Sequence, residues 1–188
     1  MIALLASVMI ATNAPAAEVV ATCRSMVPED AELKGRVILR SRKGIVQKEF
    51  PYVLTRAAGE TKLIADGQSV TNAVGQSILG TDVTWSDLAL EYLWWDDFSY
   101  VEGREGESVH GQVCSVIAMK RGDREVRVWV DRKTGALMQA EEMKGGKAVR
   151  RLWGTRIKRF GERWMANVME VETLGSGNRT KITVEELK

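Results

Sequence analysis

Residues 75–93 read GQSILGTDVTWSDLALEYL and contain the clearest helix pattern in the chain. Thr84 or Asp82 can cap this helix, and Asp87 follows Thr84 by three residues, which is the spacing of a capping box. Large apolar side chains then recur at the i, i+4, i+7 spacing of one helix face: Leu88, Tyr92 and Trp95. The stretch therefore predicts one short helix.

Most of the remaining chain alternates apolar and polar residues with a period of two, which is typical of strands. Two such runs between residues 37 and 54 flank Lys43-Gly44, a hairpin turn, and a third begins at Thr61. Six more follow Phe98 with glycine-containing turns between most of them: 112–119, 125–131, 136–143, 148–157, 164–173 and 180–187. This spacing predicts a mainly β (α+β) fold, a strongly curved antiparallel sheet or open half-barrel with a short helical lid.

The chain opens with an apolar run that is typical of a secretory signal. Residues 2–11 are too few to span a bilayer, which needs about 20 apolar residues. Ala14-Pro15-Ala16 is a small-residue pattern that suits cleavage after Ala16 or one residue later. We therefore expect a signal peptide over residues 1–16, and a single domain over residues 17–188 that is soluble in the periplasm. A buried N-terminal helix is the alternative.

After this run, residues 18–27 carry apolar side chains at helical spacing and end near Pro28, which predicts a short amphipathic helix. Cys23 lies in this segment and Cys114 in a predicted strand. In an oxidising compartment a disulfide between them would stabilise the fold by about 3–5 kcal/mol. Two buried free thiols are the alternative, because the sequence does not give the Cα separation that a disulfide requires.

Short motifs follow one another in order between residues 75 and 187: Gly80-Thr81-Asp82, Trp85, Asp87-Leu88, Gly111-Gln112-Val113-Cys114, Trp129-Val130-Asp131, the start at Gly161 of a strand with Trp164, Met169-Glu170 and Arg179-Thr180. In order and spacing they resemble the outer-membrane lipoprotein-sorting family, the LolA/LolB-like proteins. The resemblance implies a half-barrel that holds a lipid or acyl chain. Residues 36–72 keep only a generic strand pattern, so the ligand could differ from a lipoprotein acyl chain.

The resemblance also indicates which side chains would bind the ligand. It implies that the residues of the helical lid face the concave side of the sheet, while Asp87 and Glu91 face water. Aromatic and methionine side chains offer large, adaptable apolar contacts. The expected lipid-binding residues are Trp85, Leu88, Tyr92, Trp95, Trp129 and Met138. Ordinary core packing is the alternative for each of them.

The sequence contains few residues in arrangements that are typical of catalytic or metal-binding sites. His110 is the only histidine, and on a strand it would lie about 13 Å from Cys114, too far for a thiol–imidazole pair. No nucleophile elbow or phosphate-binding glycine loop is recognisable. Asp82 and Asp87 suit a helix start better than a cation site. We therefore expect neither an enzyme nor a cofactor nor a metal.

Cations concentrate in residues 147–163, although the formal net charge of the whole chain is only +2. That small net charge gives no strong attraction to nucleic acid. The local cluster could instead dock on anionic lipid head groups or an acidic partner. Its expected docking residues are Arg150, Arg151, Arg156, Lys158 and Arg159. The solvated face of two strands is the alternative.

The sequence thus predicts a periplasmic carrier that takes a lipoprotein acyl chain or free lipid into an apolar cavity and delivers it toward the outer membrane. An inner-membrane exporter or an outer-membrane acceptor would be its partner. The alternatives are a sensory or regulatory module of the cell envelope that binds lipid or protein without transport, and a structural domain with a filled core.

Overall fold

The computed structural model describes residues 14–72 and 75–188. The expected signal peptide therefore lies outside the described residues, apart from residues 14–16. Within these two ranges no helix is both long enough and apolar enough to cross a membrane.

Twelve strands make up the β structure of the described residues. They are β1 Ala31–Arg40, β2 Val46–Ala57, β3 Glu60–Ala65, β4 Gln68–Val70, β5 Asp97–Tyr100, β6 Ser108–Val109, β7 Gln112–Arg121, β8 Arg124–Asp131, β9 Leu137–Lys144, β10 Lys147–Phe160, β11 Arg163–Thr173 and β12 Arg179–Leu187. The helical elements are the α-helices α1 Ala16–Ser25 and α2 Trp85–Ala89 and the 3-10 turns η1 Ile78–Gly80 and η2 Glu91–Trp94.

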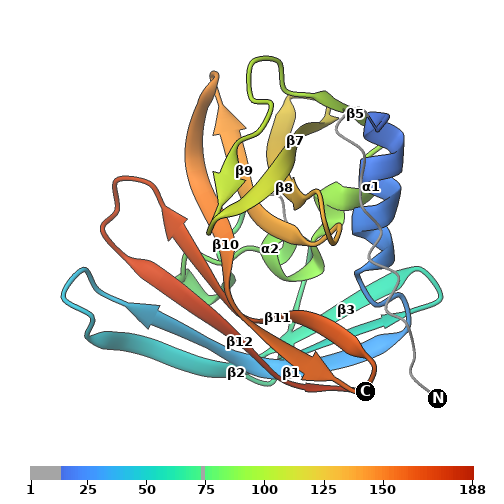
Figure 1. Cartoon of the computed structure of the whole chain (residues 1–188). Helices are drawn as coiled ribbons and strands as arrows, with labels where there is room; N and C mark the ends of the chain where they lie inside the picture. Colours follow the sequence, from blue (N-terminus) through green and yellow to red (C-terminus); the bar gives the residue numbers. More distant parts are fainter. Residues whose placement is uncertain (1–13, 73–74) are drawn as a thin grey trace.

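The strands form one antiparallel sheet in the order β4-β3-β2-β1-β12-β11-β10-β9-β8-β7-β5, with β6 paired to β7. The sheet stays open, with β4 and β5 at its two ends, and it curves around α2 while α1 stands beside β5 (Figure 1). The predicted mainly β fold, a curved antiparallel half-barrel with short helices, is therefore confirmed.

The first strand, β1, pairs with the last strand, β12, in the middle of this order. This pairing joins the N-terminal strands β1–β4 to the strands that follow α2. Their register shifts between Lys34 and Gly35. A Cβ atom on Gly35 would lie 1.8 Å from the carbonyl oxygen of Thr183 and 2.9 Å from the ring of Tyr52. The Tyr52 hydroxyl also donates to that carbonyl oxygen, over 3.2 Å. Only glycine allows the two strands to approach so closely.

The core divides into three clusters of buried side chains. The first lies between β1–β3, β12 and α2 and includes Leu63 and Trp85. The second lies between α1, η2 and the strands β7–β9 and includes Val19 and Trp95. The third is small and centres on Trp129. The curved sheet thus holds separate packing regions along its length.

Both cysteines are buried free thiols, one in the second cluster and one in the third. Burial raises the pKa of Cys23 to about 12 and that of Cys114 to about 11. Of the two alternatives that the sequence left open, the structure shows the free thiols, which pack as small apolar side chains.

The helix predicted from residues 75–93 is shorter than its apolar pattern suggests. It ends at Ala89, Leu90 takes a left-handed conformation with φ of 50°, and η2 continues the chain. Arg56 donates to the Ala89 carbonyl oxygen, and Arg24 donates to the carbonyl oxygens of Leu93 and Trp95. Arg56 thus satisfies a carbonyl group that a continuous helix would have bonded internally, and Arg24 satisfies two at the end of the segment, where a helix leaves its last carbonyl groups without partners.

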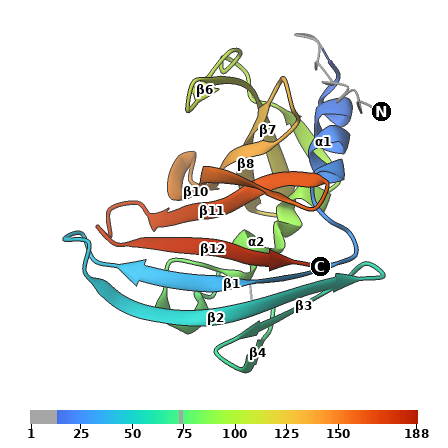
Figure 2. The same ribbon diagram turned by 60° about the horizontal axis from the view of Figure 1, so that its bottom comes forward.

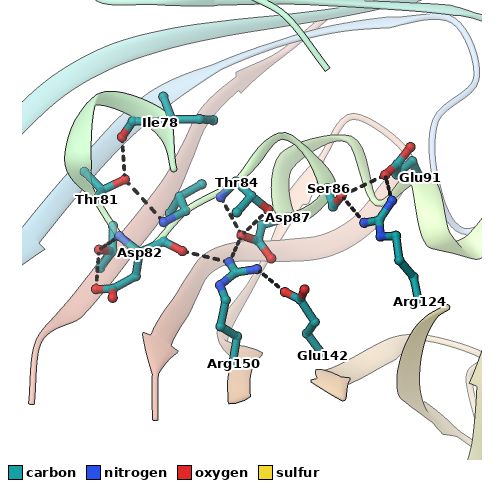
Figure 3. Close-up of polar contacts among 12 residues, drawn as sticks. Ile78, Thr81, Asp82, Thr84, Ser86, Asp87, Glu91, Arg124, Glu142 and Arg150 are labelled. Atoms are coloured by element: carbon teal, nitrogen blue, oxygen red, sulfur yellow. Dashed lines mark hydrogen bonds and ion pairs between the residues drawn. The ribbon is translucent and has the colours of Figure 1, made fainter. Parts of the chain in front are cut away.

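Arg150 of β10 holds α2 in place from the sheet (Figure 3). Asp87 accepts hydrogen bonds from the backbone and the hydroxyl of Thr84, over 2.7 and 3.0 Å, and it also pairs with Arg150. Arg150 reaches Glu142 over 2.8 Å as well. Although burial alone would lower the pKa of Arg150, these carboxylates raise it. The capping role predicted for Asp87 is confirmed, but its expected exposure to water is wrong, because it is buried against Arg150.

A second arginine, Arg124 of β8, fixes the next turn (Figure 3). It pairs with Glu91 over 3.2 Å and donates to the Ser86 hydroxyl over 3.2 Å. Burial alone would raise the pKa of Glu91, but hydrogen bonds from Ser86, Asn72 and Arg124 together lower it. The expectation that Glu91 faces water is therefore also wrong, because its side chain is only 16% exposed and its carboxylate pairs with Arg124 of the sheet. The helical segment, residues 85–94, is anchored from one side by two arginines.

Replacing Gly35 should destabilise the junction of β1 and β12. Gly35→Ala forces a Cβ atom into the Thr183 carbonyl, and we expect a loss of about 1–3 kcal/mol in the free energy of unfolding, measured by urea denaturation. Gly154→Ala is the control, because its added Cβ would meet Ala166 at 3.4 Å, an ordinary contact. Equal stability of the two variants would contradict the close approach.

Removing Arg150, the cation next to α2, should lower the free energy of unfolding more than removing Arg179, a cation on the surface. Arg150→Met leaves the buried Asp87 carboxylate unpaired, and we expect a loss of about 3–5 kcal/mol. Arg179→Met also removes a partner of two carboxylates, Glu170 and Glu172, but this side chain is 55% exposed, so about 1 kcal/mol or less is expected. Similar thermal unfolding of both variants would show that Arg150 does not anchor the helix.

Candidate functional site

The described part of the chain contains a groove of about 1160 Å³. One wall is the outer part of the sheet, from the end of β2 through β3 and β4, and the other is the helical segment, residues 85–94. Figure 2 shows β3 and β4 at the free edge of the sheet, with α2 above them. The volume exceeds the roughly 300–1,000 Å³ of common small-molecule pockets.

One row of side chains on the strand wall lies on the inner face of the sheet. Arg56 lies opposite Thr61, and Leu63 lies opposite Val70. Residues directly opposite in an antiparallel pair point to the same face. Since Leu63 is a buried member of the first core cluster, this face is the inner one. The row is thus polar at one end and apolar at the other.

Two tryptophans, Trp85 and Trp94, contribute to the opposite wall. Trp85 is only 8% exposed and belongs to the same core cluster as Leu63. Trp94 is 38% exposed, so part of its ring is open to a ligand. The guanidinium of Arg56 stacks on that ring, 5.4 Å from its centre. The groove therefore combines aromatic surface, aliphatic surface and one buried cation.

Arg56 is 7% exposed and donates from Nη2 to the Ala89 carbonyl oxygen over 2.5 Å. Burial lowers the pKa of its guanidinium. Its position could have been found in the sequence, because Phe50, Tyr52 and Leu54 alternate toward the core and residue 56 is next in that register. A charged residue in an inward register is the signal that was missed. Trp94, Leu63 and Val70 carried no comparable signal.

The six expected lipid-binding residues do not converge on one cavity. Trp85 lines the groove, and Leu88 lies behind it in the same core cluster. The other four lie in the second and third clusters: Tyr92, Trp95, Trp129 and Met138. Among these six, only Trp85 borders the groove in the described structure, and a role of any of them in lipid binding stays a prediction.

The five expected docking cations fall into two groups. Arg150 and Arg151 are ion-paired with Glu142, Asp87 and Glu141 on the sheet. The other three lie exposed toward the end of β10, beside Ile157, which is 64% exposed: Arg156, Lys158 and Arg159. Only these three of the five are exposed, and a docking role for any of the five stays a prediction.

His110 is exposed in the turn between β6 and β7 and has a φ of 51°. In the part of the chain that the structure describes, no three His, Cys, Asp or Glu side chains gather where they could hold a metal ion. Asp82, which the sequence placed at a helix start, accepts a hydrogen bond from the Thr180 hydroxyl over 3.0 Å.

Several solved structures share this fold. A LolA superfamily protein from Nitrosomonas europaea is 15% identical, with a TM-score of 0.68 and 93% of each chain covered. A putative outer membrane lipoprotein-sorting protein domain from Vibrio parahaemolyticus is 13% identical, with a TM-score of 0.66 and coverage of 91% of this chain and 90% of that one. A DUF1329 family protein from Desulfovibrio piger is 15% identical, with a TM-score of 0.64 and coverage of 93% and 92%.

At these identities the likeness shows a shared fold alone. The comparison with curated proteins finds no match. A family model described as "Uncharacterized protein" matches residues 26–188, which is most of the chain. The chain therefore belongs to the family that this model describes. Its fold is the LolA-like half-barrel that the order of its sequence motifs predicted.

Proposed function

We propose that this protein binds the acyl chain of a lipid or lipoprotein in the groove between β3–β4 and the helical segment. The observation that carries the proposal is the groove itself, about 1160 Å³ in volume and walled by Leu63, Val70, Trp85 and Trp94. Each methylene group transferred from water to such a surface contributes about 0.8 kcal/mol. A chain of a dozen or so methylene groups would therefore be retained and still be releasable to a membrane.

Release in this proposal depends on the sheet edge rather than on α2. Arg150 and Arg124 anchor the helical segment to β10 and β8. By contrast, β4 has three residues and pairs on one side only, with β3. Short edge strands with one partner have the fewest hydrogen bonds to lose. The β3–β4 hairpin is thus the wall that would open, with α2 as the fixed wall.

The proposed setting is the periplasm, reached by means of a signal peptide over residues 1–16, with residues 17–188 as the lipid-binding domain. The protein would carry its lipid from an inner-membrane exporter toward an outer-membrane acceptor. The exposed cations Arg156, Lys158 and Arg159 would hold it at an anionic membrane surface, each contributing about 1 kcal/mol. No catalytic step is part of this function.

Filling the groove should block lipid uptake. Thr61→Trp adds a large ring on the inner face of β3, and we expect the affinity for monomyristoylglycerol, a neutral lipid, to fall about tenfold or more. Gln47→Trp is the matched control, because it places the same ring on an exposed part of β2 outside the groove. Binding is measured by titration calorimetry, and native mass spectrometry with lipid extraction identifies any lipid that copurifies.

The carrier function would be contradicted if no lipid copurifies with the wild-type protein and the purified protein binds none when lipid is added. The exposed surfaces would then indicate a protein-interaction module of the cell envelope. Equal lipid binding by Thr61→Trp and Gln47→Trp would place the lipid elsewhere, for example near Trp129 and Met138.

A further inference from the structure

Arg56 is a buried cation without a carboxylate partner in the described structure. Its one side-chain hydrogen bond there goes to the backbone of Ala89, and its Nε atom is enclosed with no acceptor. Burial lowers the pKa of Arg56, and the neighbour that counteracts this is Tyr92, a phenol whose own pKa burial raises. The positive charge is therefore not neutralised by any acid on the protein that the structure describes.

Arg150 provides the internal comparison. It is also largely buried, with 16% of its side chain exposed, but it pairs with both Asp87 and Glu142. An unpaired charge that is removed from water costs several kcal/mol, so buried charges in proteins are normally paired. Arg150 follows that rule and Arg56 departs from it. An orphaned buried group of this kind needs an explanation, and an absent ligand is one.

The place of Arg56 in the groove indicates the shape of that ligand. In the row of inward side chains, Arg56 and Thr61 form one cross-strand pair and Leu54 and Leu63 the next, about 7 Å along the strands. Val70 extends the apolar part opposite Leu63. A charged and hydrogen-bonding end thus adjoins an apolar floor, which is the layout of an amphiphile.

The acidic residues of the groove do not cancel this charge. Three of them are exposed and screened by solvent: Glu29, Asp30 and Glu60. The fourth, Glu91, is paired with Arg124 over 3.2 Å and lies 3.9 Å from Arg121. The other two cations that line the groove differ from Arg56, because Lys62 is exposed and Arg121 lies near Glu91. Among the described residues of the groove, Arg56 is therefore the one buried cation that no acid pairs with.

We propose that the groove selects lipids with an oxyanion headgroup, a carboxylate or a phosphate, which pairs with Arg56 while the acyl chain lies along Leu63, Val70 and Trp85. A guanidinium presents two parallel N–H groups to such an oxyanion, and charge-assisted bonds of this type are about twice as strong as neutral ones. The inference rests on the proposed function, because it specifies the ligand class of the same groove.

The test compares three lipids that share one chain: myristate, monomyristoyl lysophosphatidate and neutral monomyristoylglycerol. Affinities are measured by titration calorimetry at pH 7.5, below the micellar concentration of each lipid. We expect at least one anionic lipid to bind about tenfold or more tightly than the neutral one. Preference for myristate would identify a carboxylate as the headgroup, and preference for lysophosphatidate a phosphate.

Substitution of the cation should abolish the preference. In Arg56→Met the anionic lipid should lose about tenfold in affinity while monomyristoylglycerol binds as before, and Arg56→Lys, which keeps the charge without the fork, should fall between. Arg36→Met is the control, because Arg36 is a cation of the neighbouring strand β1 whose side chain is 44% exposed and pairs with Glu49 outside the groove. Thermal unfolding checks that each variant is folded.

The outcomes separate this inference from the function on which it rests. Equal affinity of the wild type for all three lipids, or a preference that persists in Arg56→Met, would overturn the headgroup assignment and leave lipid binding intact. Absence of binding to every lipid would overturn the carrier function itself. If Arg56→Met does not fold, the wild-type preference and the Arg56→Lys variant decide the question.

Discussion

The pairing of Arg150 with Asp87 is the contact on which the shape of the groove depends. It joins α2 to β10 across the inside of a sheet that never closes on itself. The same carboxylate caps the helix through Thr84, so one side chain fixes both where α2 starts and where it sits. With Arg124 holding the following turn, the helical segment becomes a rigid partition. The space left between this partition and the free edge of the sheet is the groove.

Much of the sheet could be predicted because its determinants are local. Alternation and glycine turns placed the strands 125–131 and 180–187 within one residue of β8 and β12. The pairing of β1 with β12 could not be predicted in the same way. It joins strands about 150 residues apart in the sequence, and it depends on a close backbone approach at Gly35 that no periodic pattern reveals.

The helical segment shows where local reasoning fails. The spacing of Leu88, Tyr92 and Trp95 correctly indicated three buried side chains, yet the backbone between them is not one helix. Arg24 and Arg56 satisfy carbonyl groups there from elsewhere in the chain, and a helix no longer needs to continue. Trp95 is also fully buried, with Arg121 and Arg124 stacked on it, which makes it part of the anchor rather than of the groove. The apolar residue types were enough to predict that these side chains are buried. Contacts with residues far away in the sequence determine whether each one packs in the anchor or lines the groove.

Two arginines at inward-facing positions of the strands, Arg150 and Arg56, therefore have different roles in this protein. Arg150 stabilises the fold, and Arg56 is a candidate for binding a ligand. Arg150 and Arg56 both extend from the sheet toward the helical segment. Arg56 donates to the Ala89 carbonyl oxygen within it, and Arg150 donates to the Asp82 carbonyl oxygen just before it. Arg150 pairs with two carboxylates, Asp87 and Glu142, and these ion pairs account for its burial. Arg56 finds a carbonyl oxygen and an aromatic ring, which satisfy its geometry but not its charge. The two arginines lie in the same curved sheet and differ in whether an acid pairs with them. A ligand that carries an acidic group would explain why Arg56 is buried.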